Sequence, residues 1–246
     1  MPDALHWSLR SWSVEPETWA IPSAAPDWAG SWAESWEVHG VFADGPRGRN
    51  RGTLDIQCLR GSDGVLLDVV EQHPISGFFG HDTEGVVECR DDDLLSPVAW
   101  SLESVMVSGQ YRRPIELSRS LLEGTVSDGT LALDAIGSSR VALPRDVGVT
   151  CLWSLLGAMP GLFNRDTRRL GLTLLEDLQL PRTEQRLEAM GGRPVTVSNG
   201  TIELFGYRLH GRGVTPTVFW LAPDGSPVYV RGISHALLSR RWAPSA

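Results

Sequence analysis

The chain has 246 residues, of which 41% are hydrophobic, and this is enough to form a sizeable core. Its net charge of −8 and isoelectric point near 5.2 argue against nucleic acid or an anionic membrane surface as a partner, since both require a basic surface. All 22 basic residues are arginine, which excludes lysine Schiff-base chemistry and a phosphate-binding P-loop.

The N-terminal stretch "MPDALHWSLRSWSVEPETWAIPS" lacks a basic region followed by an apolar one, so we expect no secretory signal. No apolar run approaches the length of a membrane span, and we expect no membrane partner. Cys58, Cys89 and Cys151 are odd in number, form no CxxC pair and have apolar neighbours. This pattern is typical of buried free thiols in a reducing compartment, and it predicts a cytoplasmic protein.

Tryptophan is concentrated near the N-terminus, at Trp7, Trp12, Trp19, Trp28, Trp32 and Trp36. The last three recur at intervals of four after Pro26-Asp27, which places them on one face of an expected helix. We expect residues 1–35 to form a segment whose indoles pack on the rest of the domain. An aromatic wall that binds a ligand is the alternative.

From about residue 36 the hydrophobic pattern alternates with period two and continues to about residue 233. Four dipeptides that favour tight hairpin turns interrupt it: Asp63-Gly64, Asp128-Gly129, Asn199-Gly200 and Asp224-Gly225. One segment has helical spacing instead, and it predicts a single main helix near residues 148–158 that ends before Pro160.

The predicted fold class is all-β. We expect a large curved antiparallel meander that closes to a barrel, half-barrel or cup, in one domain over residues 1–246. A twisted sheet of this length must curl, because long flat sheets are rare. Its concave face is the place where a small molecule would bind.

Two C-terminal stretches, "LTLLEDLQLPRTEQRLEAMGGRPV" and "GYRLHGRGVTPTVFWLAPDGSPVYVRGI", resemble uncharacterised bacterial proteins with a curved antiparallel half-barrel. Those proteins are similar in turn to the lipoprotein-carrier type of fold. The likeness covers about the last third of the chain. It implies a sheet wrapped around a hydrophobic ligand, although this sequence has neither the signal nor the lipidation cysteine of the exported members.

The acidic stretch "GHDTEGVVECRDDDLLSP" at residues 80–97 predicts no metal site. Asp91, Asp92 and Asp93 lack the spacing of a calcium loop, and the chain has no histidine or cysteine pair of the kind that binds zinc. Aspartate runs of this kind are typical of turns. The sequence also lacks a nucleophile elbow and a dinucleotide-binding loop, so we expect no cofactor.

Ionisable residues occur where the apolar face of one expected strand ends. Val65, Leu67 and Val69 share a face that continues to Glu71 and His73, and the next strand begins near His81 and Asp82. This pattern predicts a cavity mouth with four candidate catalytic residues: His73, Asp82, His81 and Glu71. A solvated hairpin end is the alternative.

Four aromatic residues are candidates for the ligand-binding wall of the concave face: Trp100, Tyr207, Trp220 and Tyr229. Each has a polar tip that could orient a ligand held mainly by apolar burial.

Three functions remain open from the sequence. The first is a cofactor-independent acid–base enzyme, a cyclase, isomerase or lyase, acting on a small hydrophobic molecule. The second is a non-catalytic binder or carrier of such a molecule. The third is a carbohydrate-active protein that stacks sugars on tryptophan and uses two of Asp82, Glu84 and Glu103 as its carboxylates. The sequence is also compatible with a homodimer.

Overall fold

A single continuous sheet forms most of the protein. The structure is a computed structural model that describes residues 15–40, 51–76, 79–108, 115–135, 137–232 and 235–243, and within these residues 15 strands form one sheet. The strands are β1 (Trp32–Gly40), β2 (Arg51–Gly61), β3 (Gly64–Ser76), β4 (Phe79–Cys89), β5 (Pro97–Ser108), β6 (Ile115–Ser127), β7 (Thr130–Ala135), β8 (Gly137–Ala142), β9 (Gly148–Thr150), β10 (Arg169–Glu176), β11 (Leu180–Val197), β12 (Gly200–Gly211), β13 (Val214–Leu221), β14 (Pro227–Arg231) and β15 (His235–Ser239).

The strand order is β8-β7-β6-β5-β4-β3-β2-β1-β15-β14-β13-β12-β11-β10-β9. The first strand, β1, therefore lies in the middle of the sheet. From there the chain runs outward to one edge at β8, crosses to the other edge at β9 and returns to pair β15 with β1. Every pair is antiparallel except β9 with β10. Residues 143–147 alone join the two edge strands, so the sheet must curl until its edges approach each other. The prediction of a large curved antiparallel sheet is confirmed.

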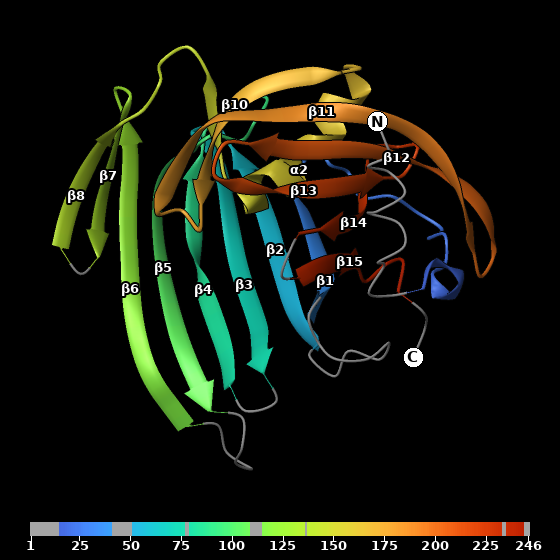
Figure 1. The fold of residues 1–246 in the computed structure, drawn as a ribbon, viewed down its shortest axis with the longest axis horizontal. Helices are drawn as coiled ribbons and strands as arrows, with labels where there is room; N and C mark the ends of the chain where they lie inside the picture. The colour runs from blue at the N-terminus through green and yellow to red at the C-terminus, as the bar shows by residue number, and fades with distance from the viewer. Residues whose placement is uncertain are drawn as a thin grey trace.

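The helix α2 (Leu152–Asn164) lies inside the curved sheet, between the wall of β2–β5 and the wall of β12–β14 (Figure 1). It begins at Cys151, whose sulfur accepts a hydrogen bond from the backbone N–H of Ser154, while the Ser154 hydroxyl accepts one from the N–H of Cys151. The helix does not end at residue 158. It continues through Pro160, which is buried, so the packing of this last turn outweighs the lost backbone hydrogen bond.

Buried apolar residues fill the space between α2 and the concave face. Leu155, Leu156 and Met159 of the helix are fully buried in one cluster with the inward residues of β1–β5, such as Trp36 and Leu67. Cys58, Cys89 and Cys151 are buried in the same cluster, as the sequence predicts. The interior is therefore a packed core and not an empty cup.

The expected helix over Trp28, Trp32 and Trp36 is wrong, because β1 begins at Trp32. An interval of four residues brings side chains to one face in a strand as well as in a helix, so the spacing could not distinguish the two. Trp32 and Trp36 point into the core, and Trp32 packs on Gly157 of α2, where an added Cβ would lie 2.6 Å from the indole. Trp7 and Trp12 lie outside the described residues.

A second apolar cluster lies on the opposite face of the C-terminal strands and is covered by the segment before β1. Trp19 is completely buried there against Tyr229, with ring centroids 5.4 Å apart. The backbone carbonyl of Trp19 accepts a hydrogen bond from the N–H of Ser198 at 2.7 Å, and the Asn199 amide bonds both backbone groups of Ile21. The sheet is thus buried on both faces around β11–β15.

Candidate functional site

Ionisable side chains follow the buried residues on the inner face of β3. Val65, Leu67 and Val69 are buried, and the same alternation brings Glu71 and His73 to the inner face at the end of the strand. The side chains of Glu71 and His73 are 19% and 25% exposed, which places them at the border between core and solvent.

The Glu71 carboxyl group has two direct neighbours. The indole N–H of Trp153, on the first turn of α2, donates a hydrogen bond to Oε2 at 3.3 Å, and Nδ1 of His73 lies 3.8 Å from Oε1. Burial raises the pKa of Glu71 to about 7, the Trp153 hydrogen bond opposes that rise, and the carboxylate of Asp177 adds to it. Glu71 can therefore exchange a proton near neutral pH.

Asp177 and His81 complete the group. Asp177 lies in the turn after β10, with φ of 50°. Burial raises the pKa of its carboxyl group, the carboxylate of Glu176 raises it further, and His81 opposes the rise. His81 on β4 stands directly opposite His73 on β3, so both histidines share the inner face. The ionisable cluster, defined as Glu71, His73, His81 and Asp177, lies beside the first turn of α2.

A cavity of about 180 Å³ adjoins the ionisable cluster through Asp177. Its wall is largely aliphatic and combines the start of α2 with the ends of β10 and of β12–β15: Leu152, Leu174, Leu175, Glu176, Asp177, Leu209, Val214, Thr215, Thr217, Val230, Gly232 and Leu237. The cavity thus places apolar surface next to groups that can donate or accept protons.

The expected position of Asp82 at this site is wrong. Asp82 pairs with Gln72 and Val105 on the outer face of the sheet, while its neighbour His81 faces inward. Adjacent residues of a strand point to opposite faces, so His81 and Asp82 could not both reach one cavity. Glu84 and Glu103 also face outward, directly opposite each other, so all three carboxylates of the carbohydrate hypothesis lie away from the interior.

The four candidate ligand-binding aromatic residues are divided between the two faces, and none of them lines the cavity. Trp100 and Tyr207 belong to the core cluster around α2 and are each 4% exposed. Trp220 and Tyr229 are paired with each other, but they lie in the opposite cluster with Trp19, which corrects their expected place on the concave face. Both strands of this hairpin are buried on both faces around these residues, so the alternation of apolar residues alone could not identify which face is the inner one.

Two residues of the site, Trp153 and Asp177, were not predicted from the sequence. Trp153 follows the helix cap and reaches β3 only because α2 lies inside the sheet. Asp177 lies in a turn without a glycine, and no local signal associates it with β3 or β4. A half-polar aromatic residue on the first turn of an otherwise buried helix was the available hint.

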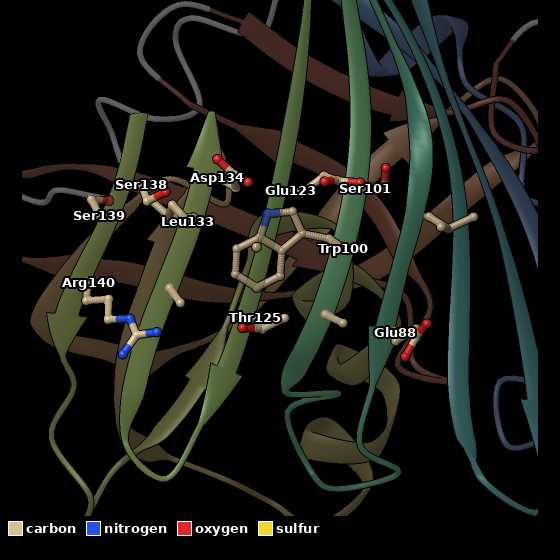
Figure 2. Close-up of a pocket in the computed structure, with 14 residues that line it drawn as sticks. Glu88, Trp100, Ser101, Glu123, Thr125, Leu133, Asp134, Ser138, Ser139 and Arg140 are labelled. Carbon is tan, nitrogen blue, oxygen red and sulfur yellow. The ribbon is translucent and has the colours of Figure 1, made fainter. Parts of the chain in front are cut away.

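A larger and more polar groove, of about 470 Å³, lies on the outer face over β4–β8. Figure 2 shows Glu88, Glu123 and Asp134 around this groove, with Arg140 on β8 at its margin. Trp100 lies beneath it and covers Gly124, where an added Cβ would come within 2.3 Å of the indole. This groove is separate from the ionisable cluster.

Within the described part of the chain, no group of three histidine, cysteine or acidic residues is placed to hold a metal ion. None of the described helices is long and apolar enough to cross a membrane.

No protein-family model matches the chain, and the comparison with curated proteins found no match. Among solved structures, the chain is similar to a beta-barrel-like protein of the domain of unknown function DUF1849 from Brucella abortus. The TM-score is 0.53 at 9% sequence identity, over 84% of this chain and 93% of that one. This similarity supports a barrel-like fold shared with an uncharacterised bacterial protein; a likeness to lipoprotein carriers is not shown.

Proposed function

We propose that the protein is a cofactor-independent acid–base enzyme whose site is the ionisable cluster and the adjoining aliphatic cavity. The supporting observation is Glu71, a largely buried carboxyl group with a pKa of about 7 whose neighbour in the ionisable cluster, Asp177, lines the cavity of about 180 Å³. A general base is most effective when its pKa is close to the working pH. Proton transfer, as in an isomerase, cyclase or lyase, is the chemistry that such a group performs.

In this proposal Glu71 takes a proton from the substrate and returns it, or passes it to a second atom. His73 Nδ1 lies 3.8 Å from Oε1 of Glu71, so the proton would pass between them through one water molecule. His81 and Asp177 add opposite charges next to this pair. The Trp153 N–H favours the ionised form of Glu71, because it donates to the carboxylate.

The size of the cavity limits the substrate. About 180 Å³ is smaller than the usual range for drug-sized ligands, and α2 occupies the space that a lipid chain would need. A small molecule with an apolar body and one polar group fits both the aliphatic wall and the ionisable cluster. The aliphatic wall also favours a second candidate function, a non-catalytic binder of the same small molecule.

A proton-abstraction probe separates the two candidates. Nitrobenzisoxazole is small and apolar; a carboxylate base removes its C–H proton, the electron pair forms a nitrile as the N–O bond breaks, and a coloured nitrophenolate is released. We expect the wild-type protein to accelerate this reaction, with a rate that rises as the pH passes 7. Glu71→Gln should lower the protein-dependent rate by roughly a hundredfold.

Asp82→Asn is the matched control, because it neutralises a carboxylate on the outer face of the neighbouring strand and should leave the rate unchanged. A wild-type rate no higher than that of buffer would favour the non-catalytic binder. An equal loss of rate in Asp82→Asn and Glu71→Gln would show that the site is elsewhere.

A further inference from the structure

The strand β8 is an open edge of the sheet. It occupies one end of the strand order, its six residues are all exposed, and Figure 1 shows no strand of the described residues beyond it. The other edge strand, β9, has only three residues. An unpaired edge of this length presents backbone N–H and C=O groups that another strand can bind.

The register of the β7–β8 hairpin shows which residues of β8 direct their backbone outward. Leu143 donates its backbone N–H to the carbonyl of Gly129 at 2.8 Å, and the pairing continues without a bulge along β8. Because backbone groups alternate in direction along a strand, Ser139 and Val141 also face β7. Ser138 and Arg140 therefore direct their backbone groups away from the sheet.

We propose that a second copy of this chain binds here, with the two β8 strands antiparallel about a two-fold axis at Ser139. In this register Ser138 of each copy stands opposite Arg140 of the other, and these two pairs exchange the backbone hydrogen bonds. Ser139 faces its own counterpart as a non-hydrogen-bonded pair, in which side chains approach most closely. The two sheets become one continuous sheet, and the contact is closed and isologous.

Charge complementarity supports this register. On the outer face, Ser138 lies in a row with Asp134 and Glu123, whose carboxylates are directly opposite each other and border the polar groove. Like charges in this position destabilise a sheet. Arg140 lies one row away, with Ala132. Arg140 of the second copy would extend over the small Ser138 side chain toward Asp134, and the same contact would form twice.

Steric complementarity on the inner face supports it as well. Val141 is 39% exposed and would stand opposite Gly137 of the second copy. Nothing lies within 4 Å of the position that a Cβ of Gly137 would occupy, so this glycine leaves room for the valine.

A contact that is limited to one strand pair and its neighbours falls below the usual size of a stable interface, about 1,200 Å². The dimer should therefore dissociate on dilution.

Cysteine cross-linking tests the register. Ser139→Cys places a thiol on the two-fold axis, and Ser138→Cys, on the adjacent residue, is the matched control whose counterpart lies across from Arg140. The native Cys58, Cys89 and Cys151 are buried. After mild oxidation of the concentrated protein we expect a covalent dimer from Ser139→Cys at least several times more abundant than from Ser138→Cys. Equal yields from the two variants, or no covalent dimer from either, would overturn the proposal.

Sedimentation of the unmodified protein tests the association itself. We expect a concentration-dependent monomer–dimer equilibrium that Arg140→Glu shifts toward the monomer, because it places a third carboxylate near Asp134 and Glu123. Adding Asp134→Arg to that variant should restore the dimer. A wild-type protein that stays monomeric at all concentrations, or a dimer indifferent to Arg140→Glu, would contradict the proposed pairing.

Discussion

The indole N–H of Trp153 donates a hydrogen bond to Oε2 of Glu71 at 3.3 Å, and this contact joins the first turn of α2 to the end of β3. The residues are 82 positions apart in the sequence. The contact exists because the helix lies inside the sheet, and it joins Glu71 to the first turn of α2, whose Leu152 lines the aliphatic cavity.

The ionisation of Glu71 should make the stability of the protein depend on pH. Its pKa is about 7 in the folded protein and near 4.5 in an unfolded chain, so the folded state holds this proton more tightly. The resulting stability is fully present below pH 4.5 and is lost as the pH rises through 7. Above pH 7, the free energy of unfolding of Glu71→Gln should therefore be higher than that of the wild type, by at most about 3 kcal/mol. Urea unfolding across this pH range measures it; a difference that persists at pH 4.5 would contradict this cause.

Trp153→Phe should raise the pKa of Glu71 further. The variant removes a hydrogen bond to the ionised carboxylate but keeps an aromatic ring of similar shape. The pH profile of the nitrobenzisoxazole reaction should move to higher pH, while the maximal rate at alkaline pH should change less. A profile that keeps its midpoint would show that Trp153 has only a packing role.

Trp19→Ala should release the N-terminal segment from the outer face of the C-terminal strands. Trp19 is completely buried against Tyr229, and removing a buried tryptophan side chain costs about 3–5 kcal/mol. Chemical denaturation measures the loss, and increased proteolysis before β1 should accompany it. Unchanged stability would mean that the segment is not an integral part of the folded domain.

Arg241→Ala should destabilise the junction between β1 and the C-terminal end of the chain. Arg241 donates to Oε2 of Glu34 at 2.7 Å, and the hydroxyl of Ser239 donates to Oε1; burial raises the pKa of Glu34 against both contacts. Removing the arginine leaves an almost fully buried carboxylate without its cation, at a cost of about 3–5 kcal/mol. The double variant Glu34→Gln/Arg241→Ala should be less destabilised than Arg241→Ala, and an equal loss in both would argue against a charge effect.

Local pattern was sufficient to predict much of the sheet. The alternation through Val65, Leu67 and Val69 brings Glu71 and His73 to the inner face, and a tight turn at Ser62 and Asp63 precedes Gly64, the first residue of β3. The same rule, applied strictly, would have placed Asp82 on the outer face.

The remaining features depend on contacts between distant segments. The pairing of β1 with β15 and the position of α2 inside the sheet have no local signature. Trp220 and Tyr229 belong to strands that are buried on both faces, so their inner face is decided by the Trp19 segment, far away in the sequence. Burial of Glu71 by Trp153 and its proximity to Asp177 follow from this tertiary arrangement.

Site-resolved NMR titration of the Glu71 carboxyl carbon tests the central claim most directly, with Glu71→Gln used to assign the signal. The proposed acid–base site predicts a titration midpoint near pH 7. A midpoint near 4.5, the ordinary value for a glutamate, would contradict it.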